Sequence, residues 1–169
     1  EQQSAYLDPH NYNLSRKNTN DINRLINILN YQANKNPDHA YVVHQRNVYH
    51  NVPLWVLINT LTYGQISKLY TLLPFQMQSS ISKNFPHVKE KPLEQYLKVL
   101  TLFRNVCAHN ERLFSFRTQI DFPDTKLHDK LSIPQKGTQY ICGKKDLFGV
   151  VIAFRYLLPA DSFLDFKRS

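Results

Sequence analysis

The residues best suited to chemistry lie in the run from Arg104 to Phe114, which reads RNVCAHNERLF. Arg104 supplies a guanidinium, Asn105 an amide and His109 an imidazole. When RNA is cleaved by its own 2′-hydroxyl, a base removes the 2′-proton, an acid protonates the 5′-oxygen and a cation stabilises the phosphorane. Histidine titrates near neutral pH, and arginine offers a planar donor fork to phosphate. These residue types therefore suit RNA cleavage without a metal.

The spacing alone carries little information. The chain has eight Arg and seven His among its 169 residues. An Arg followed by a His five to seven positions later is then expected about once by chance. Arg104 and His109 form the one such pair, so their helical setting has to supply the rest of the argument.

That setting is a helix predicted from Pro92 to Phe114, because proline favours the first helical turn and the next Pro or Gly is Pro123. Its polar residues fall on one narrow stripe: Glu94, Lys98, Thr101, Asn105, His109 and Arg112. Most other positions are apolar, and Cys107 is predicted to be a buried thiol. A solvated face of an ordinary amphipathic helix explains the stripe too. A thin polar seam on a largely apolar helix also suits a cleft floor or a subunit interface.

One histidine cannot easily act as base and acid in the same step. A two-fold dimer that presents the two stripes to each other would supply a second His109. The residues therefore favour a homodimer, with no metal required.

At these residues the chain resembles a known family. Arg104, Asn105 and His109 are similar to the Arg-x4-6-His signature of the HEPN superfamily, with a polar residue directly after the Arg. Three segments, Pro53 to Tyr70, Leu100 to Phe114 and Tyr140 to Phe148, resemble Abi-like (AbiD/AbiF) bacterial abortive-infection proteins.

The resemblance implies an all-α fold, a HEPN-type helical bundle, and a dimer with a metal-independent ribonuclease site that acts in anti-phage defence. It makes Arg104, Asn105 and His109 the catalytic candidates. Family members are about twice this long, so the resemblance also implies that the chain lacks an N-terminal half. A guide RNA or an antitoxin is a possible further partner.

The composition fits a nucleic-acid partner. The formal net charge is +8, which favours polyanions without setting the fold. Lys98, Arg112, Lys144 and Lys145 are further candidates for RNA binding, although a solvated lysine pair is the default interpretation of Lys144 and Lys145. The two cysteines give neither a disulfide framework nor a zinc pattern, and His39, His44 and His50 match no zinc spacing.

The chain pattern predicts one domain. Residues 1–18 are polar and are expected to form a tail or linker, and residues 19–169 a HEPN-like helical domain. Helices are expected from Thr19 to Asn36, near Ala40, from Pro53, from Gly64 to Pro74 and from Phe75 to Phe85. A long irregular connection then runs from Phe116 to Lys145, before a helix that Asp146 caps.

No signal peptide and no apolar run near 18 residues is evident, so a cytoplasmic protein that does not span the membrane is expected. Two functions remain open on these grounds. The first is an RNA endonuclease of abortive infection. The second is a non-catalytic RNA-binding or dimerisation module of a defence or toxin–antitoxin system.

Overall fold

The chain is seen in a computed structural model that describes residues 4–15 and 17–168. It consists of helices, with one two-stranded antiparallel sheet among the described residues, and the predicted all-α class is confirmed. The chain divides into two compact units, Glu1–Gln78 and Ser79–Ser169. We call them the N-terminal and the C-terminal unit.

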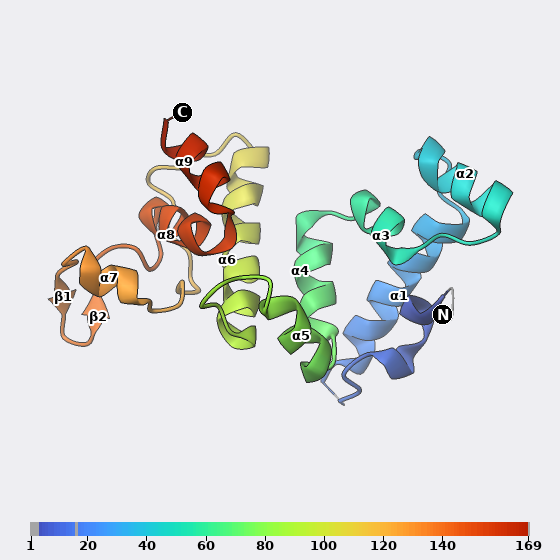
Figure 1. The fold of residues 1–169 in the computed structure, drawn as a ribbon, viewed down its shortest axis with the longest axis horizontal. Helices are drawn as coiled ribbons and strands as arrows, with labels where there is room; N and C mark the ends of the chain where they lie inside the picture. Colours follow the sequence, from blue (N-terminus) through green and yellow to red (C-terminus); the bar gives the residue numbers. More distant parts are fainter. Residues whose placement is uncertain (1–3, 16, 169) are drawn as a thin grey trace. The chain divides into compact units, whose positions relative to one another are not determined.

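The N-terminal unit is built on α1 (Thr19–Asn34), against which α2 (Ala40–Tyr49), α3 (Leu54–Leu57) and α4 (Tyr63–Leu72) pack (Figure 1). A 3₁₀ turn (Ile58–Thr60) follows α3, and α5 (Phe75–Ser82) crosses the boundary between the units. Ile22, Leu25 and Leu29 recur at helical spacing and are buried, so α1 forms where the sequence predicts it.

The break before α4 lies at Thr62 rather than at Gly64. The Thr62 hydroxyl accepts a hydrogen bond from the backbone of Gln65, and the Gln65 side chain accepts one from the backbone of Thr62. This capping box starts a new helix at Tyr63. Gly64 is then an ordinary residue of its first turn.

The segment expected to be a polar tail is folded over its described part. Two 3₁₀ turns, Ala5–Leu7 and Pro9–Asn11, pack on α1, and Tyr12 is only 5% exposed. Hydroxyl groups hold the segment: Tyr12 donates to the carbonyl of Tyr6 at 2.6 Å, and Tyr6 donates to that of Val52 at 2.8 Å. These long-range partners are invisible to a composition argument, which sees only a polar run.

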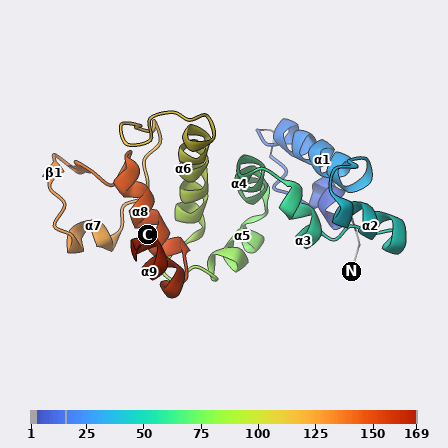
Figure 2. The same ribbon diagram turned by 90° about the horizontal axis from the view of Figure 1, so that it is seen from above.

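The C-terminal unit is arranged around α6 (Glu90–Ala108), its longest helix. It also contains α7 (Lys126–Lys130), β1 (Gln135–Lys136), β2 (Gln139–Tyr140), α8 (Leu147–Leu157) and α9 (Ala160–Arg168). Figures 1 and 2 show α8 beside α6, with α9 folded back on α8. Each successive turn of α6 contributes to its buried side, which consists of Leu93, Tyr96, Val99, Leu100, Phe103 and Val106.

The predicted irregular connection is present, and it is held to the unit by buried groups. Phe122 is fully buried, and its backbone N–H donates to the carbonyl of Lys144 at 2.6 Å. The absence of a side chain at Gly149 on α8 leaves room for the Phe122 ring, because a Cβ there would lie 2.3 Å from Cδ2 of Phe122. As predicted, the Asp146 carboxylate caps α8 by accepting from the N–H of Gly149.

None of the helices in the described part of the chain is long and apolar enough to cross a bilayer.

Candidate functional site

The three catalytic candidates lie at the C-terminal end of α6. Arg104 and Asn105 belong to its last turn, and His109 is the C-cap. All three side chains are exposed. A guanidinium nitrogen of Arg104, Nη1, lies 3.4 Å from Oδ1 of Asn105, to which it donates. The structure therefore presents a cation, an amide and an imidazole to solvent at one helix end.

The helix ends earlier than predicted, at Ala108 rather than at Phe114. Asn110 adopts the left-handed conformation, with φ of 55°. The N–H of Asn110 donates to the carbonyl of Cys107 at 3.3 Å, and the N–H of Glu111 donates to that of Val106 at 3.1 Å. This is the Schellman arrangement, in which Asn replaces the more usual Gly. The Asn110 position was the sequence signal for the helix end.

The structure changes two expectations about the residues predicted to lie on this helix. Arg112 lies beyond the helix, so it is not part of the stripe on α6. The expectation that Cys107 is buried is wrong, since its side chain is exposed in the last turn. The part of the stripe that remains on α6 or at its cap is Glu94, Lys98, Thr101, Asn105 and His109.

The candidate cations differ in their ion pairs. Lys98 pairs with Glu94 one turn earlier, Lys144 with Asp124, and Lys145 with Asp121. Among the residues that the structure describes, Arg104 and Arg112 make no salt bridge. Their charge is therefore available to an anionic ligand, whereas the three lysines are already compensated.

Of these three lysines, Lys144 has the least exposed side chain. Its side chain is only 12% exposed, and its ammonium donates to the carbonyl of Phe122 and the carboxylate of Asp124. The partners lie about twenty residues away in sequence. Lys144 therefore fastens the irregular connection to the start of α8.

A buried histidine of the same unit was not singled out from the sequence. His128 is fully buried in α7. Its Nδ1 accepts from the N–H of Thr125 at 3.2 Å, and its Nε2 lies 3.2 Å from the carbonyl of Gly143. Tyr140 stacks on the ring, with centroids 4.6 Å apart. With both nitrogens engaged and no exposure, His128 holds the connection together and cannot reach a substrate.

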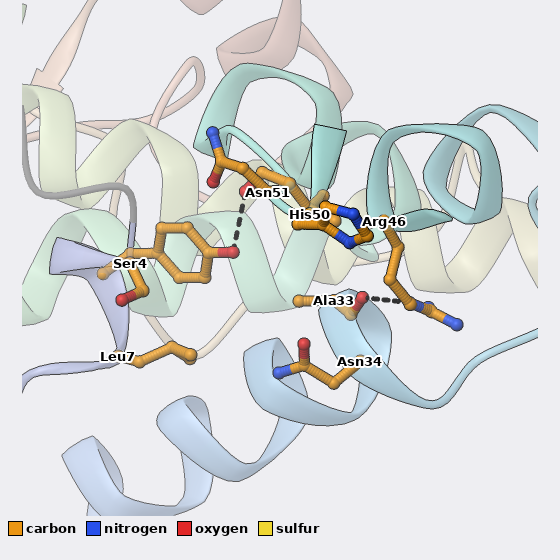
Figure 3. Close-up of a pocket in the computed structure, with 9 residues that line it drawn as sticks. Ser4, Leu7, Ala33, Asn34, Arg46, His50 and Asn51 are labelled. Atoms are coloured by element: carbon orange, nitrogen blue, oxygen red, sulfur yellow. Dashed lines mark hydrogen bonds between the residues drawn. The ribbon is translucent and has the colours of Figure 1, made fainter. Parts of the chain in front are cut away.

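The N-terminal unit has a separate polar pocket of about 480 Å³, shown in Figure 3. Two of its polar side chains, those of Arg46 and Tyr6, bond to the backbone. Arg46 donates through Nε to the carbonyl of Ala33 at 2.7 Å, and through Nη2 to those of Gln32 and Asn36. It thereby satisfies the C-terminal carbonyls of α1. Burial raises the pKa of Tyr6, whose hydroxyl donates to Val52. The pocket also contains the imidazole of His50, but the guanidinium of Arg46 is engaged by three backbone carbonyls, whereas that of Arg104 is exposed.

Residues 4–15 and 17–168 contain no group of three or more His, Cys, Asp or Glu side chains placed to hold a metal ion.

Residues 2–115 match the family described as Abi-like protein. The match covers more than half of the chain and includes the whole end of α6. The chain belongs to the Abi-like family. Of the three segments that resemble it, Pro53 to Tyr70 and Leu100 to Phe114 lie inside the match, and Tyr140 to Phe148 lies outside it. Membership associates this Abi-like chain with abortive-infection defence. Neither a curated protein nor a solved structure matches it.

Proposed function

We propose that this Abi-like protein is a metal-independent RNA endonuclease of bacterial abortive infection, with a HEPN-type site made of Arg104, Asn105 and His109. The observation that carries the proposal is that these side chains are exposed together at the end of α6, inside the family match. Arg104 is also free of any carboxylate partner among the described residues.

Each residue has a role in the proposed reaction. The 2′-oxygen attacks the adjacent phosphorus as its proton passes to a base, and the P–O bond to the 5′-oxygen breaks as an acid protonates that oxygen. The imidazole of His109 is the proton-transfer group. Arg104 stabilises the charge on the phosphorane. Asn105 orients the guanidinium through the hydrogen bond to Oδ1.

Because the chain supplies one such imidazole, acid and base together require a second copy. A homodimer in which two α6 ends face one phosphodiester provides both. The products are then a 2′,3′-cyclic phosphate and a free 5′-hydroxyl, since no water enters the first step.

The decisive experiment compares wild type with His109→Ala on RNA in the presence of EDTA. We expect the substitution to lower the cleavage rate by at least about 100-fold, which is the usual size of a lost acid–base group. His44→Ala is the matched control, because His44 is also exposed but lies on α2. Cleavage by His109→Ala at the wild-type rate, or cleavage only after a divalent ion is added, would contradict the proposal.

A second candidate function is a non-catalytic RNA-binding module. It is favoured by one observation: within the described part of the chain no group hydrogen-bonds the ring of His109, and Asn105 contacts Arg104 instead. A catalytic imidazole usually has a partner that orients it. If the module is non-catalytic, His109→Ala will leave RNA affinity unchanged, and wild type will cut RNA under no condition.

A further inference from the structure

The loop that follows α6 is fixed to the helix at both of its ends. We call residues 110–116 the clasped loop. At its start, the N–H of Glu111 donates to the carbonyl of Val106. At its end, the ring of Phe116 meets that of Phe103 edge-on, with centroids 5.1 Å apart and an angle of 90°. Phe103 is buried and directly precedes Arg104. The clasped loop is therefore held beside the proposed site.

Between these two anchors, Phe114 points into solvent. Its side chain is 82% exposed, more than that of any other large apolar residue in the described part of the chain. A single exposed apolar residue is common on protein surfaces. Phe114 differs because neighbouring aromatic packing holds its backbone in place while its own ring covers nothing.

The sequence around Phe114 is basic. Arg104, Arg112 and Arg117 lie within the sequence from 104 to 117, and Glu111 is the one acidic residue there. Across residues 4–15 and 17–168, none of these three arginines pairs with a carboxylate. An exposed ring close in sequence to guanidinium groups that have no carboxylate partner is a combination by which proteins hold single-stranded nucleic acid, since rings stack on bases and arginines bind phosphates.

We propose that Phe114 stacks on the base of an unpaired nucleotide while Arg112 binds an adjacent phosphate, so that the protein selects single-stranded RNA. The inference takes RNA as the ligand from the proposed function and adds the strandedness of the substrate and the residues that read it. A base inside a duplex is already stacked on its neighbours, so Phe114 has no free face to bind there.

The test measures binding apart from cleavage, in the His109→Ala background. The probe is an RNA oligonucleotide containing 2-aminopurine, used either alone or annealed to its complement. We expect Phe114→Ala to weaken single-strand affinity about tenfold and to remove the fluorescence quenching by stacking. Phe114→Trp should retain both. Ile141→Ala is the control, because this residue is also exposed, at 60%, in the same unit.

Two results would overturn the inference. The first is unchanged single-strand affinity in Phe114→Ala, or an equal loss for the duplex. The second is a shift of Phe114→Ala from dimer to monomer in sedimentation, with affinity lost only through that shift, which would place Phe114 in a subunit contact. Thermal unfolding checks that each variant is folded.

Different results would contradict the proposed nuclease activity and the proposed stacking role of Phe114. Wild type that binds single strands through Phe114 but never cuts them contradicts the nuclease alone. Wild type that cuts single strands, with Phe114→Ala just as active and as tightly bound, contradicts the stacking role alone.

Discussion

The candidate RNA-binding cations of the C-terminal unit have unequal freedom to bind a ligand. Lys98 is compensated by Glu94, and Lys144 is mostly buried among its acceptors. Arg104 is exposed, and its hydrogen bond to Asn105 joins it to a neutral amide. A neutral partner leaves the full charge for a phosphate, whereas a carboxylate partner would have to be displaced first.

Replacing Arg104 with Lys should therefore be costly although the charge is kept. Lysine is a point charge without the donor fork, so we expect RNA cleavage to fall at least about tenfold in Arg104→Lys. Lys98→Ala should keep the cleavage rate within about twofold, because its charge is already paired on the same helix. Initial cleavage rates of both purified variants decide this. Equal losses in the two would show that only net charge matters.

The C-terminal end of α6 depends on a single backbone conformation. Asn110 has a positive φ, and the two hydrogen bonds that close the helix follow from it. Its predecessor His109 is thereby held at the C-cap, with its N–H donating to the carbonyl of Asn105 at 3.0 Å. The position of the imidazole is therefore a property of the helix end as well as of the residue type.

Substitutions of Asn110 should show whether the helix end depends on the positive φ of this position or on the asparagine side chain. Gly adopts positive φ freely, so Asn110→Gly should unfold at or slightly above the wild-type temperature. Asn110→Ala should lose about 1 kcal/mol, because the left-handed conformation penalises its Cβ. Asn27→Ala, at an exposed position within α1, is the control and should cost nothing. An Asn110→Ala variant as stable as wild type in urea unfolding would contradict this account of the helix end.

At the scale of the whole molecule, charge is divided unequally between the units. The C-terminal unit has fifteen Lys and Arg against nine Asp and Glu, a net of +6, and the N-terminal unit has six against four, a net of +2. The unit that carries the proposed site therefore also carries most of the attraction for a polyanion. Tyrosines with raised pKa values, in contrast, occur in both units.

These tyrosines predict a loss of stability at alkaline pH. Burial raises the pKa of Tyr12 from 10.0 to about 12, and burial also raises the pKa of Tyr96. A group whose pKa is higher in the folded state stabilises the fold below its unfolded pKa, and this contribution is lost as pH rises. The free energy of unfolding should thus fall between pH 10 and 12.

The variant Tyr12→Phe tests the assignment. It should be less stable at pH 8 by about 1 kcal/mol, because the hydrogen bond to Tyr6 is lost. Its further decline between pH 10 and 12 should be smaller than that of wild type. Tyr31→Phe, at a half-exposed position, should decline as wild type does. Urea unfolding at pH 8, 10 and 12 measures these differences, and parallel curves for all three proteins would exclude Tyr12 as a cause.

Much of this architecture could be predicted from local pattern. The start and apolar face of α1, the Asp146 cap of α8 and the helical placement of Arg104 and Asn105 follow from residue spacing and capping chemistry. The end of α6 was predicted six residues too late because Asn is a weaker stop signal than Gly. The folded state of residues 4–13 could not be predicted, because the partners of Tyr6 and Asn13, Val52 and Leu72, lie far along the chain.

The sequence by itself determined which chemical groups stand near one another, since the order of residues along one helix fixes Arg104, Asn105 and His109 within about two turns. Tertiary structure decided which of the candidate cations are free. An ion pair such as Lys144 with Asp124, or a ring contact such as Phe116 with Phe103, joins residues whose separation along the chain carries no local signal. Such contacts form only when the whole unit packs, and they leave Arg104, Arg112 and Phe114 facing solvent.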